Sequence, residues 1–115
     1  KGTPVRWSDS RIEIVEMPAV SGALLLLRRE TVVDEDVFSN DFIVGDYEDA
    51  DLCLRLFARG LKSCLVRGGR MYHLERQSFV DLGSATGRHA LSYMNCRILN
   101  RKWGESLSTR FAVAE

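Results

Sequence analysis

The sequence predicts a single α/β domain in which a mixed sheet is flanked by helices. Residues 19–27 (AVSGALLLL) form an unbroken apolar run of strand length, which is typical of a strand covered on both faces. Residues 48–59 have the apolar periodicity of an amphipathic helix, and residues 61–66 read as a second strand. These three stretches, in this order, favour the α/β class.

The helix over residues 48–59 has sequence signals at both ends. Asp46 is placed as its N-cap, and Gly60 is placed as the glycine that follows its last turn. Its apolar stripe is formed by Ala50, Cys53, Leu54, Phe57 and Leu61, with Leu52 and Leu56 widening it. Asp51 is expected to face away or to pair with Arg55 one turn later.

The other elements are predicted from weaker patterns. We expect strand-like alternation near residues 12–17, a short helix over 30–38 and an extended segment over 70–73. A second helix is expected over residues 86–103, stopped by Gly104 and followed by a loosely attached tail at 105–115. Leu91, Met94, Ile98 and Leu99 are expected to point inward from that helix.

Composition limits the class of protein. The 115 residues suit one domain, and 16 basic residues balance 16 acidic ones, which argues against a dedicated nucleic-acid binder. Three widely spaced cysteines, Cys53, Cys64 and Cys96, form neither a zinc pattern nor a disulfide framework, which indicates reduced, buried thiols in a cytosolic protein. No apolar run is long enough to span a bilayer. Because the chain begins at Lys1, we expect it to be part of a longer protein.

Four carboxylates gather at the start of the first helix: Asp46, Glu48, Asp49 and Asp51. Capping and the helix dipole account for one or two acids, but four within six residues exceed that need. A carboxylate presented at a helix N-terminus can accept a proton from a hydroxyl within hydrogen-bond reach. Asp49 lies in the first turn and Glu48 about a hundred degrees around the helix from it, so one of the two can face a pocket while the other orients a partner or caps the helix.

Two further positions extend this candidate site. Gly22, beside Ser21, lies at the start of the apolar run, where a glycine marks either the close approach of a ligand or tight packing. His73 ends the segment Met71-Tyr72-His73; a lone histidine is more often structural than a ligand, and ligation by it needs donors from elsewhere. Ser78 has no triad context beyond His73.

Taken together, residues 19–104 resemble the C-terminal half of an inverting family 2 glycosyltransferase with the GT-A fold. The resemblance rests on AVSGALLLLRRE, YEDADLCLRLFARGL, KSCLVR, MYHLERQS and NCRILNRKWG, all in order and at matching spacing. One departure is the stretch 36–41, which lacks the glycines of the family's Gly-Gly-Phe-Asp-like turn. The family's nucleotide-binding half, with its Asp-x-Asp motif, is not in this sequence.

The resemblance implies a partial nucleotide-diphospho-sugar transferase fold and a hexosyltransferase activity. It implies that Asp49 deprotonates the acceptor hydroxyl, that Glu48, Gly22, Ser21 and Asp46 position substrate, and that His73 approaches the metal or the diphosphate. A divalent ion, Mn²⁺ or Mg²⁺, is expected to bind only together with the missing half. The partners implied are a nucleotide-sugar donor and a hydroxyl acceptor, and this chain alone is expected to be inactive.

Two other functions fit the same residues. One is a non-catalytic interaction module that keeps the fold without the chemistry. The other is a small metal-dependent hydrolase using Asp46, Asp49 and His73. Under the leading glycosyltransferase interpretation, we expect a cytoplasmic protein, membrane-associated only through a longer parent chain, and homodimerisation of this piece through exposed core surface.

Overall fold

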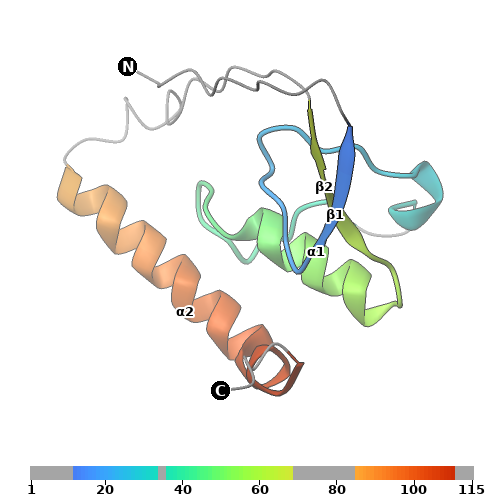
Figure 1. The fold of residues 1–115 in the computed structure, drawn as a ribbon. Helices are drawn as coiled ribbons and strands as arrows, with labels where there is room; N and C mark the ends of the chain where they lie inside the picture. Colours follow the sequence, from blue (N-terminus) through green and yellow to red (C-terminus); the bar gives the residue numbers. More distant parts are fainter. Residues whose placement is uncertain (1–11, 34–35, 69–84, 111–115) are drawn as a thin grey trace, which may run out of the picture.

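The computed structural model describes residues 12–33, 36–68 and 85–110. The elements in order are β1 (Glu13–Met17), the 3₁₀ turn η1 (Arg29–Thr31), α1 (Glu48–Ala58), β2 (Ser63–Arg67) and α2 (Ala85–Arg110). Figure 1 shows α1 between the strand pair and the long helix α2. The α/β class is confirmed at this coarse level. The sheet in the described residues is a two-stranded antiparallel pair rather than the mixed sheet predicted.

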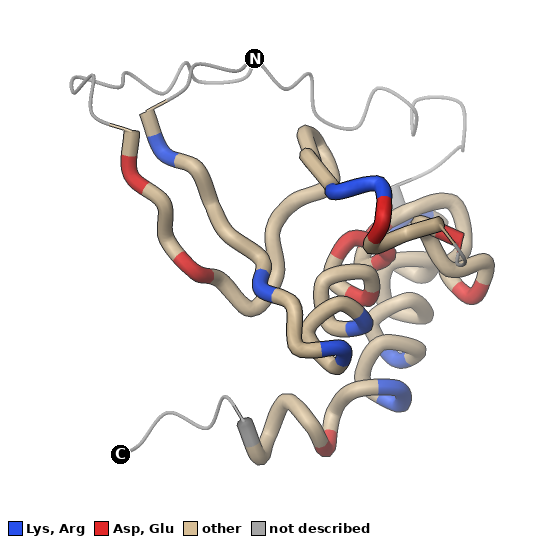
Figure 2. The backbone as a smooth tube through the Cα atoms, turned by 90° about the vertical axis from the view of Figure 1, so that its right-hand side faces the viewer, with Lys and Arg blue, Asp and Glu red and all other residues tan. Residues whose placement is uncertain are grey.

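The strand pair is held in register by its charged ends. Glu13 lies opposite Arg67 and Met17 opposite Ser63. Arg67 donates to Glu13 at 3.3 Å, and Lys62, just before β2, donates to Glu16 at 2.7 Å. Figure 2 shows this division, with acidic positions on one strand and basic positions on the other. All four side chains are about half exposed, so water and salt screen the two pairs and each adds little to stability.

The apolar core gathers around α1. Its buried apolar residues, among those described, are Phe42, Leu52, Cys53, Leu54 and Leu56. Gly60 follows the helix with φ 81°, its N–H donating to Phe57 while Leu61 N–H donates to Leu56. This pair of bonds is a Schellman motif, which needs a left-handed residue at the position of Gly60. The predicted helix and its predicted end are therefore confirmed.

The helix α2 is longer than predicted. It starts where expected but runs through Gly104 to Arg110, so the predicted stop and the predicted tail over 105–110 are wrong. A single glycine inside a helix costs only about 1 kcal/mol, which the surrounding turns outweigh. Leu91, Ile98 and Leu99 are half-buried as expected, whereas Met94, expected to point inward, is 49% exposed.

The strand predicted over residues 19–27 does not form. That segment has no regular secondary structure, and its leucines Leu24 and Leu26 are 73% and 98% exposed. A strand needs a neighbour to accept its hydrogen bonds, and in the described residues β2 pairs with β1 instead. The helix predicted over 30–38 is likewise wrong, since the described part of that stretch contains only η1. The predicted segment 70–73 lies outside the described residues.

Candidate functional site

A strained loop leads into α1. Val44, Asp46 and Tyr47 have φ values of 68°, 70° and 75°, and Gly45 between them has φ 147°. Each non-glycine residue held in the left-handed region costs about 1–2 kcal/mol, and for a β-branched valine this conformation is unusual. Such strain persists only where other contacts impose it, and it is concentrated at functional sites.

Asp46 is not the N-cap of α1. Tyr47 occupies that position in a left-handed conformation, and no side chain caps the helix. An N-cap residue normally has an extended backbone, whereas Asp46 has a positive φ. Because Tyr47 also lies between Asp46 and the first helical residue, the prediction that Asp46 caps α1 is wrong. Asp46 stays close to the site through the backbone alone, and its predicted role in substrate positioning remains a prediction.

Asp49 and Gly22, which are 27 residues apart, meet in space. The Gly22 N–H donates to Asp49 Oδ2 at 2.7 Å, and the Ala50 N–H donates to Asp49 Oδ1 at 2.8 Å. A Cβ built on Gly22 would lie 3.2 Å from Asp49 Cβ, tighter than ordinary side-chain contacts. Position 22 therefore favours glycine, because a side chain there would crowd the Asp49 side chain against the backbone. Each carboxylate oxygen keeps a further lone pair for another donor.

Ser21 and Glu48 flank this contact along the chain. Ser21 Oγ accepts from the Ala23 N–H at 3.3 Å and so shapes the turn that presents Gly22. Glu48 Oε2 is buried and has no hydrogen-bond partner among the described residues. Buried polar atoms are almost always paired, so an unpaired carboxylate oxygen next to Asp49 in sequence requires an explanation.

Asp51 is the most buried acid of the cluster. It is 0% exposed and accepts from Arg55 Nε at 3.0 Å, Trp103 Nε1 at 2.8 Å and Lys102 Nζ at 3.0 Å. The predicted pairing with Arg55 is confirmed, but the prediction that Asp51 faces away is not. Burial alone would lower the pKa of Lys102, yet its hydrogen bonds to Asp41 and Asp51 outweigh this and raise the pKa.

Asn95 on α2 is a site residue that the sequence analysis did not identify. It is 0% exposed, and among the described residues its side chain bonds to the loop before α1. Its Oδ1 accepts from the Ile43 N–H at 3.0 Å, and its Nδ2 donates to the carbonyls of Ile43, at 2.9 Å, and Gly45. Its spacing in the sequence could have indicated its burial, because Asn95 lies four residues after Leu91 and three before Ile98, on the inward face of α2.

Tyr47 makes a second contact between that loop and α2. A hydrogen bond with Cys96 is the largest of the effects that raise the pKa of Tyr47, and a hydrogen bond with Ser92 acts in the opposite sense. Both partners lie within a turn of Asn95. The loop thus has polar partners on α2 at Ser92, Asn95 and Cys96. Cys96 and Cys64 are exposed, so the predicted burial of the three thiols is confirmed only for Cys53.

The predicted metal role of His73 cannot be placed, because His73 and Ser78 lie outside the described residues. Within residues 12–33, 36–68 and 85–110, no group of three or more His, Cys, Asp or Glu side chains is arranged to hold a metal ion. In the same ranges, no helix has both the length and the apolar character needed to cross a bilayer.

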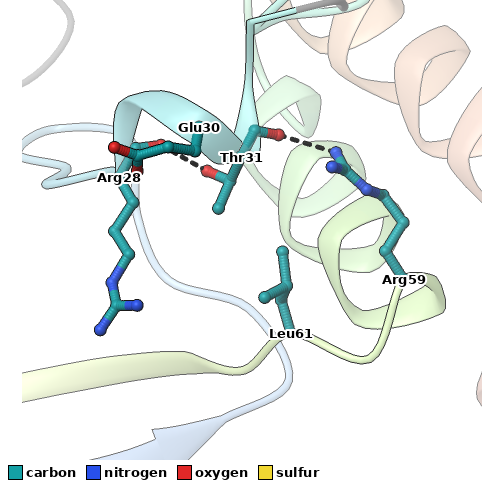
Figure 3. Close-up of a pocket in the computed structure, with 5 residues that line it drawn as sticks. All are labelled: Arg28, Glu30, Thr31, Arg59 and Leu61. Carbon is teal, nitrogen blue, oxygen red and sulfur yellow. Dashed lines mark hydrogen bonds between the residues drawn. The ribbon is translucent and has the colours of Figure 1, made fainter.

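Two surface hollows lie away from Asp49. The larger, about 780 Å³, is at the C-terminal end of α1 and is lined by Arg28, Glu30, Thr31, Arg59 and Leu61. Figure 3 shows the Arg59 guanidinium turned toward the Thr31 carbonyl, to which it donates at 2.7 Å, while Arg28 points elsewhere. The smaller, about 240 Å³, is lined by residues around Lys62 and Phe57. Neither hollow contains a predicted site residue.

Comparison of the chain with protein-family models, with curated proteins and with solved structures finds no match. The class of protein that the geometry supports is therefore an α/β protein with a carboxylate site at a helix N-terminus. A more specific function has to be argued from the contacts of the site residues.

Proposed function

We propose that this chain carries the catalytic-base side of an inverting glycosyltransferase, which transfers a sugar from a nucleotide-sugar donor to an acceptor hydroxyl. The observation that supports it best is the 2.7 Å hydrogen bond from the Gly22 N–H to Asp49 Oδ2. It joins the two segments on which the resemblance to family 2 depends, the glycine-containing run and the acidic helix start.

In this proposal Asp49 accepts the proton of the acceptor hydroxyl as that oxygen attacks the anomeric carbon. The bond from this carbon to the donor's diphosphate oxygen breaks in the same step, and the nucleoside diphosphate leaves. The N–H groups of Gly22 and Ala50 hold the carboxylate in one orientation, so that a lone pair of fixed direction faces the acceptor. Glu48 is proposed to position the acceptor; because its Oε2 is buried without a partner in the described part of the chain, the side chain must turn outward to accept from a substrate hydroxyl. The donor diphosphate and a divalent ion belong to a nucleotide-binding half outside this sequence.

A non-catalytic module is the second candidate, and one observation favours it. Both oxygens of Asp49 already accept a backbone N–H, so the same carboxylate can act as a latch between two segments. In that case the aspartate stabilises the fold and has no chemical role. The two candidates differ in what a charge-neutral substitution does.

The test compares Asp49→Asn with a matched control in a protein that also contains the nucleotide-binding half. Asparagine keeps the size of the side chain and an acceptor for Gly22 but cannot take a proton. We expect transfer to fall about 10²- to 10⁴-fold, the usual contribution of a general base, with donor binding retained. Asp41→Asn, at an exposed acid paired with Lys102, is the control and should transfer at close to the normal rate.

Full transfer by Asp49→Asn would show that Asp49 is not the base. Equal losses in Asp49→Asn and Asp41→Asn would point to a general effect on folding. Incubation of this chain alone with UDP- or GDP-sugars and Mn²⁺ is expected to consume no donor, and turnover there would contradict the proposal as well.

A further inference from the structure

The loop before α1 holds a conformation that its own sequence does not favour. Four successive residues, 44–47, have positive φ, although only one of them is a glycine. Asp49 lies two residues beyond this run, in the first turn of α1. The path of the loop therefore fixes where the first turn of α1 begins and how the Asp49 carboxylate is aimed.

Asn95 is the side chain that holds the start of this loop. Its amide bonds both the N–H and the carbonyl of Ile43, the same pair of groups that a neighbouring strand would use. The same Nδ2 also donates to the Gly45 carbonyl. Only a primary amide offers one acceptor and two donors in one plane, so no aspartate or leucine of similar size can replace these three bonds.

We propose that Asn95 is a positioning residue for Asp49, acting from a helix that contributes no group to the reaction. This inference rests on the proposed transferase function, in which Asp49 is the base. Asn95 fixes Ile43 and Gly45, the loop then enters α1 through Tyr47, and the first turn aims Asp49 at Gly22. Because Asn95 is buried, water does not compete with its side chain for the backbone groups of Ile43 and Gly45.

The effect of Asn95 differs from that of other polar residues of α2. Lys102 and Trp103 bond to the Asp51 side chain, in α1 itself, rather than to the backbone of residues 43–47. Asn100 lies on the same helix but is exposed and has no bond to the loop. Loss of the Asn95 bonds should therefore change the rate of transfer more than the binding of donor.

The experiment compares Asn95→Asp with Asn100→Asp, the same chemical change at two positions of α2. The first keeps an acceptor for the Ile43 N–H but sets a carboxylate oxygen against the two carbonyls. In the enzyme with its nucleotide-binding half, we expect Asn95→Asp to lower kcat about 10- to 100-fold, as misplacement of a reacting group does, with the donor KM within about twofold. Asn100→Asp should change neither constant.

A second readout does not require the proposed function. In amide spectra of this chain, the Gly22 N–H signal reports its bond to Asp49, and we expect Asn95→Asp to shift it while Asn100→Asp does not. If Asn95→Asp fails to fold, as judged by circular dichroism, Asn95→Gln takes its place, because it keeps all three bonding groups but moves them by one methylene.

The outcomes separate the two claims. A Gly22 signal unmoved by either Asn95 variant overturns the positioning role. Equal loss in kcat and donor affinity, in step with the folded fraction, shows a purely structural role and also overturns it. If the unsubstituted enzyme transfers no sugar, the proposed function fails, and the Gly22 signal alone then decides whether Asn95 orients Asp49.

Discussion

Asp51→Ala tests whether the buried acid, rather than the apolar core alone, holds α2 against α1. Asp51 is 0% exposed and accepts bonds from Arg55, Lys102 and Trp103. Alanine would remove an acceptor that these three groups share, although Arg55 keeps its bonds to the Asp36 and Val37 carbonyls and Lys102 keeps its bond to Asp41. The side chains of Arg55 and Lys102 are only 21% and 29% exposed. Breaking a buried charge pair costs about 3–5 kcal/mol, and the neutral bond adds about 1 kcal/mol.

Because both cations keep other partners, the low end of this range applies, and the expected loss in the free energy of unfolding is about 3–4 kcal/mol, a large part of the stability of a typical small domain. Asp41→Ala is the matched control, because Asp41 pairs with the same Lys102 at 2.9 Å but is 59% exposed. An exposed ion pair contributes far less to stability than a buried one, because water and salt screen it. Urea unfolding, followed by circular dichroism and by the fluorescence of Trp103, measures both. Equal losses of unfolding free energy in the two variants would refute the conclusion that the buried Asp51 holds α2 against α1.

Three further predictions follow from single contacts. Gly22→Ala should displace the Asp49 side chain by a few tenths of an ångström, because the new Cβ would lie 3.2 Å from Asp49 Cβ. Gly22→Val should break the hydrogen bond between the two residues. An unchanged hydrogen-exchange rate of the residue 22 amide in the valine variant would contradict this. The hydrogen bond from Lys102 lowers the pKa of Asp41, so its contribution to stability is present above pH 3.8 and lost as the pH falls through the lowered pKa. The difference in melting temperature between wild type and Asp41→Asn should accordingly vanish in strong acid, and a difference that persists there would disprove it. Calorimetry with Mn²⁺ should detect no binding to this chain alone, since no described cluster can hold a metal, whereas tight binding would favour the metal-dependent hydrolase.

Local sequence signals predicted the local structure well. The helix α1, its Schellman end at Gly60 and the strand β2 each depend on residues within a turn or two, and all three are confirmed. The α/β class followed from these elements. The GT-A fold and the family remain proposals.

The failures came where structure depends on distant partners. The run at 19–27 has a strand's composition, but pairing is decided by which segments meet, and here β1 meets β2. Leu26, at 98% exposed, shows how little composition says about burial. In the same way, the pairing of Asp51 with Arg55 was visible at i+4, while Trp103, 52 residues away, was not.

The candidate site was predictable in part. The approach of Gly22 to Asp49 agrees with the choice of both residues from sequence, although the contact itself could not be foreseen over 27 positions. Asp46 was misplaced because the N-cap rule assumes an extended residue, and the loop has positive φ instead. Asn95 was missed because a polar residue on the inward face of a helix gives no signal about what it binds.

The measurement that tests the central claim most directly is a crystal structure of this chain joined to its nucleotide-binding half, with an unreactive donor and an acceptor bound. We predict an Asp49 carboxylate oxygen within about 3.2 Å of the acceptor hydroxyl, with His73 on the same side, near the diphosphate. An acceptor bound elsewhere, or His73 on the face of the molecule opposite Asp49, would contradict the account.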